Sequence, residues 1–109
     1  ETISVSKFLA DQGLVPSRQA IDHLFAGWDH KAVIEWPEWN ARLTMTAKSP
    51  LDTLVVYTPA GQDYFCVEPV SNTADAFNGY AAGRKDTGTV MLQPGATLSA
   101  AAEFQPELT

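Results

Sequence analysis

The stretch NARLTMTA, residues 40–47, alternates between polar and apolar side chains along its whole length. Its apolar set is Ala41, Leu43, Met45 and Ala47, and its polar set is Asn40, Arg42, Thr44 and Thr46. Successive side chains of a β-strand point to opposite faces of the sheet. The spacing therefore predicts a half-buried strand that turns its apolar set toward the interior.

Two further segments show the same alternation. The apolar positions of residues 31–36 are Ala32, Ile34 and Trp36, and those of residues 97–104 are Leu98, Ala100, Ala102 and Phe104. We predict a strand at each segment, with these side chains facing inward. Pro37 is expected to end the first of the two, because its nitrogen carries no hydrogen for the ladder.

Short apolar runs supply the remaining predicted strands. Residues 54–57, 64–67 and 89–92 are rich in β-branched and aromatic side chains, and the first two suit strands that are covered on both faces. Turn-forming pairs and triplets punctuate the pattern at Ser49-Pro50, Pro59-Ala60-Gly61 and Pro94-Gly95. Regularly spaced short strands of this kind predict an all-β fold, a sandwich or a barrel, in one domain spanning residues 1–109.

Helical patterns are weak by comparison. Residues 6–12 and 16–23 are compatible with short helical turns, but neither carries a long apolar stripe. Residues 71–87 form a long predicted loop, and long loops in small domains are often functional.

Composition restricts the classes of function. The 109 residues include 7 basic and 13 acidic side chains, a formal charge of -6, and no run of lysine or arginine. We therefore expect no nucleic-acid partner, because phosphate binding depends on clustered cations. The apolar runs are too short to span a bilayer, so no membrane association is expected.

Two features of the chain bear on its compartment. The single cysteine, Cys66, cannot form an internal disulfide, and residues 1–14 lack the pattern of a secretory signal. Both favour a cytoplasmic location. The chain starts at Glu1 instead of methionine, so we expect it to be processed or to come from a longer protein.

The segment DYFCVEPVSNTADAFN, residues 63–78, carries the strongest chemical signal. Alternation places Tyr64, Cys66 and Glu68 on one face of a strand that Pro69 is expected to end. A carboxylate at the rim of an apolar strand is partly desolvated, which makes it a better proton acceptor once it is ionised. The simpler alternative from spacing alone is an exposed glutamate at a strand end.

The run CVEPVSNTADAFN, residues 66–78, resembles the signature of aldose 1-epimerases, the galactose mutarotases, in which Cys-x-Glu precedes Asp-Ala-hydrophobic-Asn. Three more stretches are similar to segments of that family in order and spacing: IDHLFAGW (21–28), LVVYTPAGQDYF (54–65) and VMLQPGATLSA (90–100). Four ordered matches are more specific than any single one. The resemblance implies an antiparallel β-sandwich of which this chain is the C-terminal part.

The resemblance also implies a reaction: interconversion of the α and β anomers of free hexoses, without a cofactor, by acid/base opening of the ring. Glu68 falls on the family's catalytic glutamate, Asp22 on its substrate-binding aspartate, and Gln62 near a glutamine that contacts sugar in some members. The family's acid is a histidine upstream of these residues. We therefore expect it in a missing N-terminal portion of the same sandwich, which would be the partner of this chain.

Other candidate residues are interpreted structurally. His23 and His30 match neither histidine of the family site, and we expect surface or turn roles for both. Cys66 is expected to be inert packing, and the three tryptophans, Trp28, Trp36 and Trp39, are expected in the core or at its margin. No metal site is expected, because the acidic residues lack calcium-loop spacing and two histidines with one cysteine do not make a zinc site.

Two other functions stay open at this point. One is a carbohydrate-binding module of the same fold, which would hold a hexose without turnover. The other is a hexose-6-phosphate mutarotase, which would need clustered arginines, whereas Arg18, Arg42 and Arg84 lie far apart in the sequence.

Overall fold

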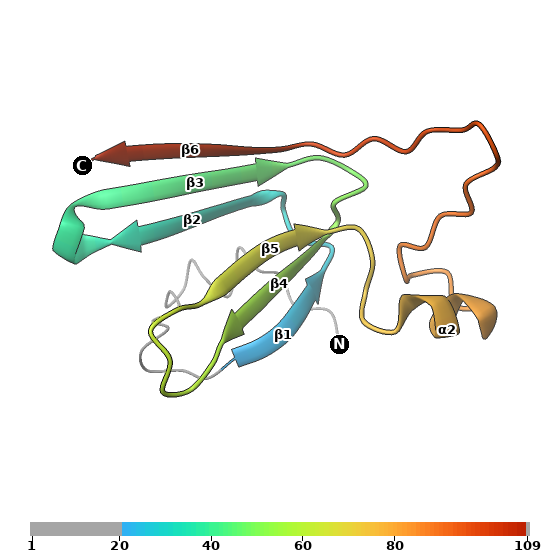
Figure 1. Cartoon of the computed structure of the whole chain (residues 1–109), viewed down its shortest axis with the longest axis horizontal. Coiled ribbons are helices and arrows are strands. Elements are labelled where there is room, and N and C mark those ends of the chain that lie inside the picture. The colour runs from blue at the N-terminus through green and yellow to red at the C-terminus, as the bar shows by residue number, and fades with distance from the viewer. Residues whose placement is uncertain (1–20, 109) are drawn as a thin grey trace.

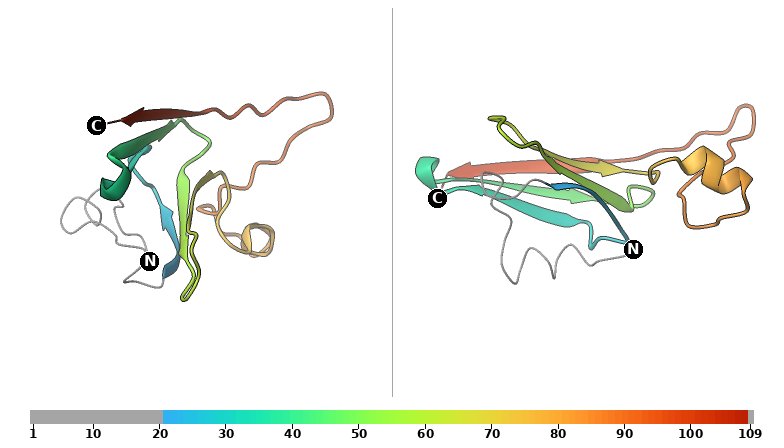
Figure 2. Two further views of the ribbon diagram at one scale, coloured as in Figure 1. Left: turned by 60° about the vertical axis from the view of Figure 1, so that its left-hand side comes forward. Right: turned by 90° about the horizontal axis from the view of Figure 1, so that it is seen from below.

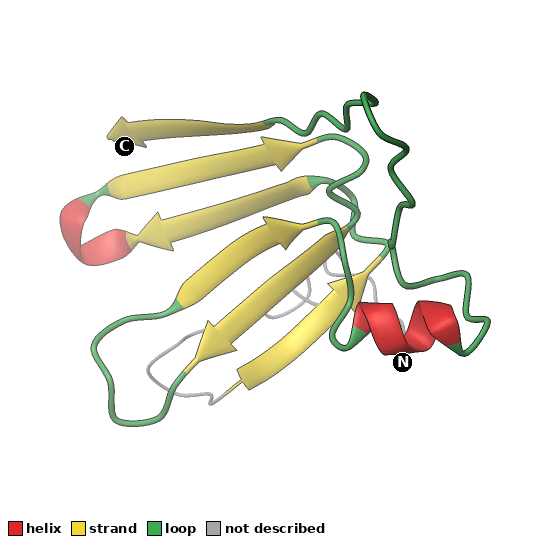
Figure 3. Ribbon diagram, turned by 45° about the vertical axis from the view of Figure 1, so that its right-hand side comes forward, coloured by secondary structure: helices red, strands yellow, loops and turns green. Residues whose placement is uncertain are grey.

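The computed structural model describes residues 21–108 of the chain. Within that range, six strands form two three-stranded antiparallel sheets (Figures 1 and 3). Sheet A has the order β1 (Ile21–Ala26), β4 (Thr53–Thr58), β5 (Cys66–Val70), and sheet B has the order β2 (Lys31–Trp36), β3 (Ala41–Ala47), β6 (Ala102–Leu108). A short helix, α2 (Ala76–Ala81), follows β5, and a 3-10 helix, η1 (Pro37–Trp39), joins β2 to β3. The predicted all-β, antiparallel architecture is confirmed.

The strands with the clearest alternation match their predictions. β3 covers residues 41–47 of the NARLTMTA stretch, and Met45 and Ala47 are buried as expected. β2 spans residues 31–36, and Pro37 ends it by starting η1. Asn40 then takes a left-handed conformation with φ 49°, which returns the chain into β3. These two strands pair along their whole length, from Lys31 opposite Thr46 to Trp36 opposite Ala41.

The core lies between the two sheets. Sheet A contributes Phe25, Leu54 and Val56, and sheet B contributes Ala32, Met45 and Ala47. Trp28, in the connection from β1 to β2, is buried with them, and its Nε1 donates a hydrogen bond of 2.9 Å to the carbonyl oxygen of Leu51. This bond satisfies the polar end of a large buried ring and ties the β1–β2 connection to the turn before β4. Core packing therefore fixes which face of sheet A points inward.

Two strand predictions in sheet A are wrong in detail. The run at residues 54–57 is covered on one face only, because Leu54 and Val56 are buried whereas Tyr57 is 37% exposed. The run at residues 64–67 begins its ladder only at Cys66, and the strand continues past Pro69 to Val70. In residues 21–108, β5 is an edge strand, and an edge strand tolerates proline because the missing N–H can face away from the neighbouring strand.

The predictions for the C-terminal third fail more broadly. Residues 89–92 and 97–101 form no strand, and β6 starts only at Ala102. Leu98 and Phe104 are 48% and 57% exposed instead of facing a core. In the described part of the chain, the apolar residues of 89–101 have no ladder partner, so alternation alone does not make them a strand.

The remaining segments differ in smaller ways. The short helix predicted at residues 6–12 lies outside the described residues. The one predicted at residues 16–23 is wrong at its end, because residues 21–23 belong to β1 and pair with residues 56–58 of β4. The long loop at residues 71–87 contains α2, which lies beyond the end of sheet A at which β5 finishes (Figure 1). Within residues 21–108, neither helix has the length or the apolar composition of a membrane-spanning segment.

Candidate active site

The face of sheet A that points away from the core carries two of the three predicted site residues. Asp22 pairs with Tyr57, which in turn pairs with Cys66, and this row crosses all three strands. The next row on the same face runs from Leu24 through Val55 to Glu68. Antiparallel partners share a face of the sheet, so Asp22 and Glu68 lie on one surface. Their Cα atoms are about 12 Å apart by the spacing of strands and residues in a regular sheet.

A pocket of about 450 Å³ opens at the Asp22 end of this face. Its walls include Asp22, Tyr57, Pro59, Gln62 and Tyr64. Sites for small molecules usually occupy about 300–1,000 Å³, so the hollow has the size of a ligand site. The structure thus brings Asp22 and Gln62 together, whereas Glu68 lies one row away on the same face and is not part of the pocket wall.

Local turn geometry explains the position of Gln62. Its backbone N–H donates to the carbonyl oxygen of Pro59 at 3.4 Å, and Gly61 adopts φ 74° between them. A left-handed residue at this point suits glycine, which has no Cβ to clash. The turn follows the end of β4 directly. Because Tyr57 of β4 pairs with Asp22 of β1, the turn brings Gln62 to the same end of the sheet as Asp22.

Glu68 lies in the middle of β5 instead of at its end, so the predicted strand end at Pro69 is wrong. Its side chain is exposed, while its neighbours Val67 and Pro69 are half-buried. The described residues therefore do not provide the partial desolvation that the strand pattern predicts. The carboxylate lies on the face of sheet A that points away from the core, hereafter the open face, in the row next to Asp22 and Tyr57.

The loop that follows β5 uses the residues of the Asp-Ala-Phe-Asn tetrapeptide to build a turn. Asp75 takes a left-handed conformation with φ 54°, and Asn78 Nδ2 donates to Asp75 Oδ1 at 2.7 Å. Short polar side chains of this kind often stabilise such turns. The backbone N–H of Thr73 donates to the carbonyl oxygen of Thr87 at 2.9 Å, which closes the loop around α2. The tetrapeptide thus has a structural role just beyond the strand that holds Glu68.

His30 occupies a turn, as expected. It has φ 64°, and its Nε2 lies 2.7 Å from Asp52 Oδ1, which also accepts a 2.7 Å hydrogen bond from the Ser49 hydroxyl. The hydrogen bond from Ser49, and after it the one from His30, hold the pKa of Asp52 below its ordinary value. Serine and histidine both bind the aspartate and do not bind each other, so this cluster is no activated nucleophile. It joins the β1–β2 turn to the β3–β4 turn.

The predicted surface or turn role of His23 is wrong. It lies in β1 on the same face as Phe25, toward the core, and the two rings meet edge to face with centroids 4.8 Å apart. Its Nε2 is buried and makes no hydrogen bond within residues 21–108. Asp22, the adjacent residue, points to the opposite face because side chains alternate along a strand. His23 therefore does not face the pocket.

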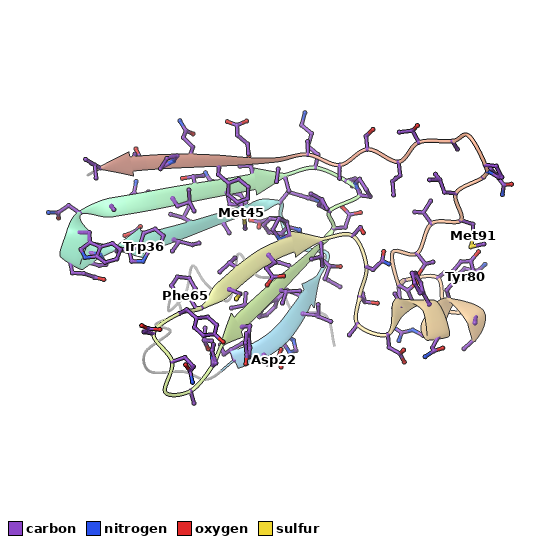
Figure 4. The ribbon with its side chains drawn as sticks, viewed as in Figure 1. Asp22, Trp36, Met45, Phe65, Tyr80 and Met91 are labelled. Atoms are coloured by element: carbon purple, nitrogen blue, oxygen red, sulfur yellow. The ribbon has the colours of Figure 1, made fainter. Side chains whose placement is uncertain are left out.

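The tryptophans do not line the pocket. Trp28 is in the core, whereas Trp36 and Trp39 stack on each other at the end of sheet B, with ring centroids 6.3 Å apart. Figure 4 shows Trp36 at that end together with Phe65, whose ring centroid is 6.4 Å away. The aromatic residues of the pocket are Tyr57 and Tyr64. The sequence pattern placed Tyr64 on the face of Glu68 without a role in binding, and it missed Tyr57 as a site residue. Alternation within β4 contained the signal, because burying Leu54 and Val56 sends Tyr57 to the other face.

The part of the chain that the structure describes contains no group of three histidine, cysteine or acidic side chains arranged to hold a metal ion. Cys66 is free and half-buried beside Tyr57 in the cross-strand row. The polar side chains that line the pocket supply a carboxylate, an amide, two phenols and the Thr58 hydroxyl, a set that suits hydrogen bonding to a neutral polyhydroxyl ligand.

Comparisons with known proteins agree with the sequence pattern. A family model described as aldose 1-epimerase matches residues 3–105, which is nearly the whole chain. The fold of that family is a β-sandwich, in agreement with the two antiparallel sheets. No curated protein and no solved structure gives a significant match.

Proposed function

Because the chain belongs to the aldose 1-epimerase family, we propose that it forms part of an enzyme that interconverts the α and β anomers of free hexoses. The observation that carries this proposal is the shared open face of sheet A. That face holds the carboxylates of Asp22 and Glu68, and a ligand-sized pocket at its end is walled by Asp22 and Gln62. A neutral sugar suits such a surface better than an anionic ligand does, because the nearby charges are negative.

Each proposed role follows from the chemistry of ring opening. Glu68 takes the proton from the anomeric hydroxyl, the bond between C1 and the ring oxygen breaks, and an acid protonates that oxygen. Rotation about C1–C2 and reversal of the proton transfers close the ring on the other face of the carbonyl. Asp22 and Gln62 bind sugar hydroxyls and hold the ring in place. Only protons move, and none is gained or lost over the cycle.

The acid must come from elsewhere in this proposal. His23 faces the core, and His30 binds Asp52 at the opposite end of β1 from Asp22. We therefore place the acid histidine on a further, N-terminal part of the same sandwich, one that covers the open face and desolvates Glu68. On the inner face of sheet B, Phe104 and Leu108 of β6 are 57% and 85% exposed, which supports a further part of the sandwich beside that sheet. To supply the acid, the same part would also have to reach the face of sheet A that carries Glu68.

The two alternative functions, a carbohydrate-binding module and a hexose-6-phosphate mutarotase, differ in how well the positions of the side chains support them. A carbohydrate-binding module is favoured by the position of Glu68, one row outside the pocket wall. A mutarotase of hexose 6-phosphates finds less support, because Arg42 lies near Glu35 and Glu107 on sheet B and Arg84 pairs with Asp86. Neither arginine belongs to the pocket, and Arg18 lies outside the described residues.

Polarimetry with the complete protein tests the proposal. We expect it to accelerate the mutarotation of freshly dissolved α-D-glucose or α-D-galactose. Glu68→Gln keeps the shape of the side chain but removes the base, so we expect kcat to fall by about 100-fold or more. Glu103→Gln, the same substitution at another exposed strand glutamate, is the matched control and should keep full activity.

Two results would contradict the assignment. Wild-type turnover by the Glu68→Gln variant would remove Glu68 from the mechanism. A complete protein that binds hexose, measured by isothermal titration calorimetry, but leaves the mutarotation rate unchanged would favour the carbohydrate-binding module.

A further inference from the structure

We propose that Tyr57 is the floor of the hexose pocket and that its ring lies against the C–H face of the pyranose. This inference rests on the proposed function, since it assumes that the ligand is a sugar. The residues that the family resemblance singles out, Glu68, Asp22 and Gln62, are all polar. They account for contacts to hydroxyl groups, but not for the apolar face that every pyranose ring also presents.

The first support is the place of Tyr57 in the sheet. It lies on the central strand of sheet A, directly opposite Asp22 on β1 and Cys66 on β5. Glu68 pairs with Val55, two residues before Tyr57, so Tyr57 and Glu68 are diagonal neighbours. Diagonal partners have Cα atoms about 7–8 Å apart, which is within reach of an aromatic side chain. Tyr57 is therefore adjacent to both carboxylates and forms part of the pocket wall together with Gln62.

The second support is its exposure on a rigid element. Tyr57 is 37% exposed and lies on the face away from the core, although β4 lies in the centre of its sheet. The backbone of a central strand is paired on both sides, so the ring has a fixed base. Because a tyrosine side chain has only two rotatable torsions, ordering it on binding costs little entropy. A rigid exposed ring next to two carboxylates is suited to orient a ligand.

The third support is the chemistry of the ligand. A pyranose has hydroxyl groups around its rim and C–H groups on its faces. The electron-rich face of an aromatic ring attracts the positive edges of C–H bonds, while carboxylates and amides bind the rim. With its ring below the sugar, Tyr57 would leave the hydroxyls free for Asp22 and Gln62. Tyr64, which is 52% exposed in the loop before β5, forms a side wall of the same pocket.

The test compares three variants of the complete protein by polarimetry over a range of hexose concentrations. Tyr57→Leu removes the ring but keeps an apolar side chain, and we expect KM to rise about tenfold. Because the ring binds substrate and transition state alike, kcat should change little. Tyr57→Phe keeps the aromatic ring and removes only the hydroxyl, so its KM should stay within about threefold of the wild-type value. Tyr80→Leu, at a tyrosine that is 43% exposed on α2 and remote from Asp22 (Figure 4), is the matched control.

Saturation-transfer difference NMR gives a readout that does not depend on turnover. Saturating the aromatic protons of the wild-type protein should mark the C–H protons on one face of the bound hexose, and Tyr57→Leu should lose most of that signal. If the protein is active and Tyr57→Leu leaves KM unchanged, the inference is overturned while the proposed function stands. If the wild-type protein shows no activity, the proposed function fails. The NMR comparison then decides about Tyr57, because an unchanged transfer pattern in Tyr57→Leu would refute the inference.

Discussion

At the scale of single residues, the cluster of Ser49, His30 and Asp52 makes a prediction about pH. Both hydrogen bonds to Asp52 favour its charged form and lower its pKa in the folded state. A carboxyl group with a lowered folded pKa stabilises the protein above its unfolded pKa, and this stabilisation is lost as the pH falls through the folded value. The cluster should thus support the junction of two turns at neutral pH and fail in acid.

We expect Asp52→Asn to lower the free energy of unfolding at pH 7 by about 1 kcal/mol or less, since the groups are half-exposed and screened by solvent. Urea unfolding at pH 7 and at pH 3 measures the effect, and the difference from wild type should shrink at the lower pH. Asp29→Asn, at an exposed aspartate in the β1–β2 turn, is the control. A difference that grows in acid would contradict the assignment of this cluster.

At the scale of elements, the loop after β5 depends on Gly88. It adopts φ 79°, and a Cβ atom at this position would collide with the carbonyl oxygen of Ser71. The close approach holds the end of the loop against the residues that directly follow β5. Since β5 carries Glu68, the geometry of this contact also bears on the proposed site.

Gly88→Ala should therefore destabilise the protein by about 2–4 kcal/mol, which combines backbone strain with a steric clash. Gly95→Ala is the matched control, because Gly95 has φ 83° but open space around its Cα. It should cost only the left-handed conformation, about 1–2 kcal/mol. Thermal unfolding of both variants measures the difference, and equal shifts in melting temperature would show that the Ser71 contact is unimportant.

The strands also differ in how well the sequence predicts them. β2 and β3 were predictable almost to the residue, because each alternates clearly and pairs with its neighbour across a short turn. The apolar runs at 89–92 and 97–101 failed, because alternation describes side chains and does not supply a partner strand. For the site, family resemblance was needed to choose Asp22 and Gln62. Alternation in β4 turns Tyr57 away from the core, but only the pairing register places it opposite Asp22.

At the scale of the whole molecule, the two sheets share one core, but apolar side chains of β6 lie outside it. Figure 2 shows β6 running along the edge of sheet B and α2 with its flanking coil extending past the sheets. The Cα radius of gyration is 15.6 Å. A compact domain of this length would have about 13 Å. The apolar face that begins in the core at Met45 continues onto β6, where its partner Phe104 is exposed. The proposed N-terminal part of the sandwich would cover this surface.

If an N-terminal part covers β6, one double substitution should have different effects in the isolated chain and in the complete protein. In the isolated 109-residue chain, Phe104→Gln with Leu108→Gln should reduce binding of a hydrophobic dye such as ANS, because two exposed apolar side chains are removed. In the complete protein, the same change should lower the free energy of unfolding by about 3–5 kcal/mol, since each side chain would lose its apolar contacts. Val33→Gln, on the other face of sheet B, should have little effect in either context. If the complete protein tolerates the double substitution without loss of stability, no further part of the sandwich covers β6, and the proposed source of the acid histidine loses its support.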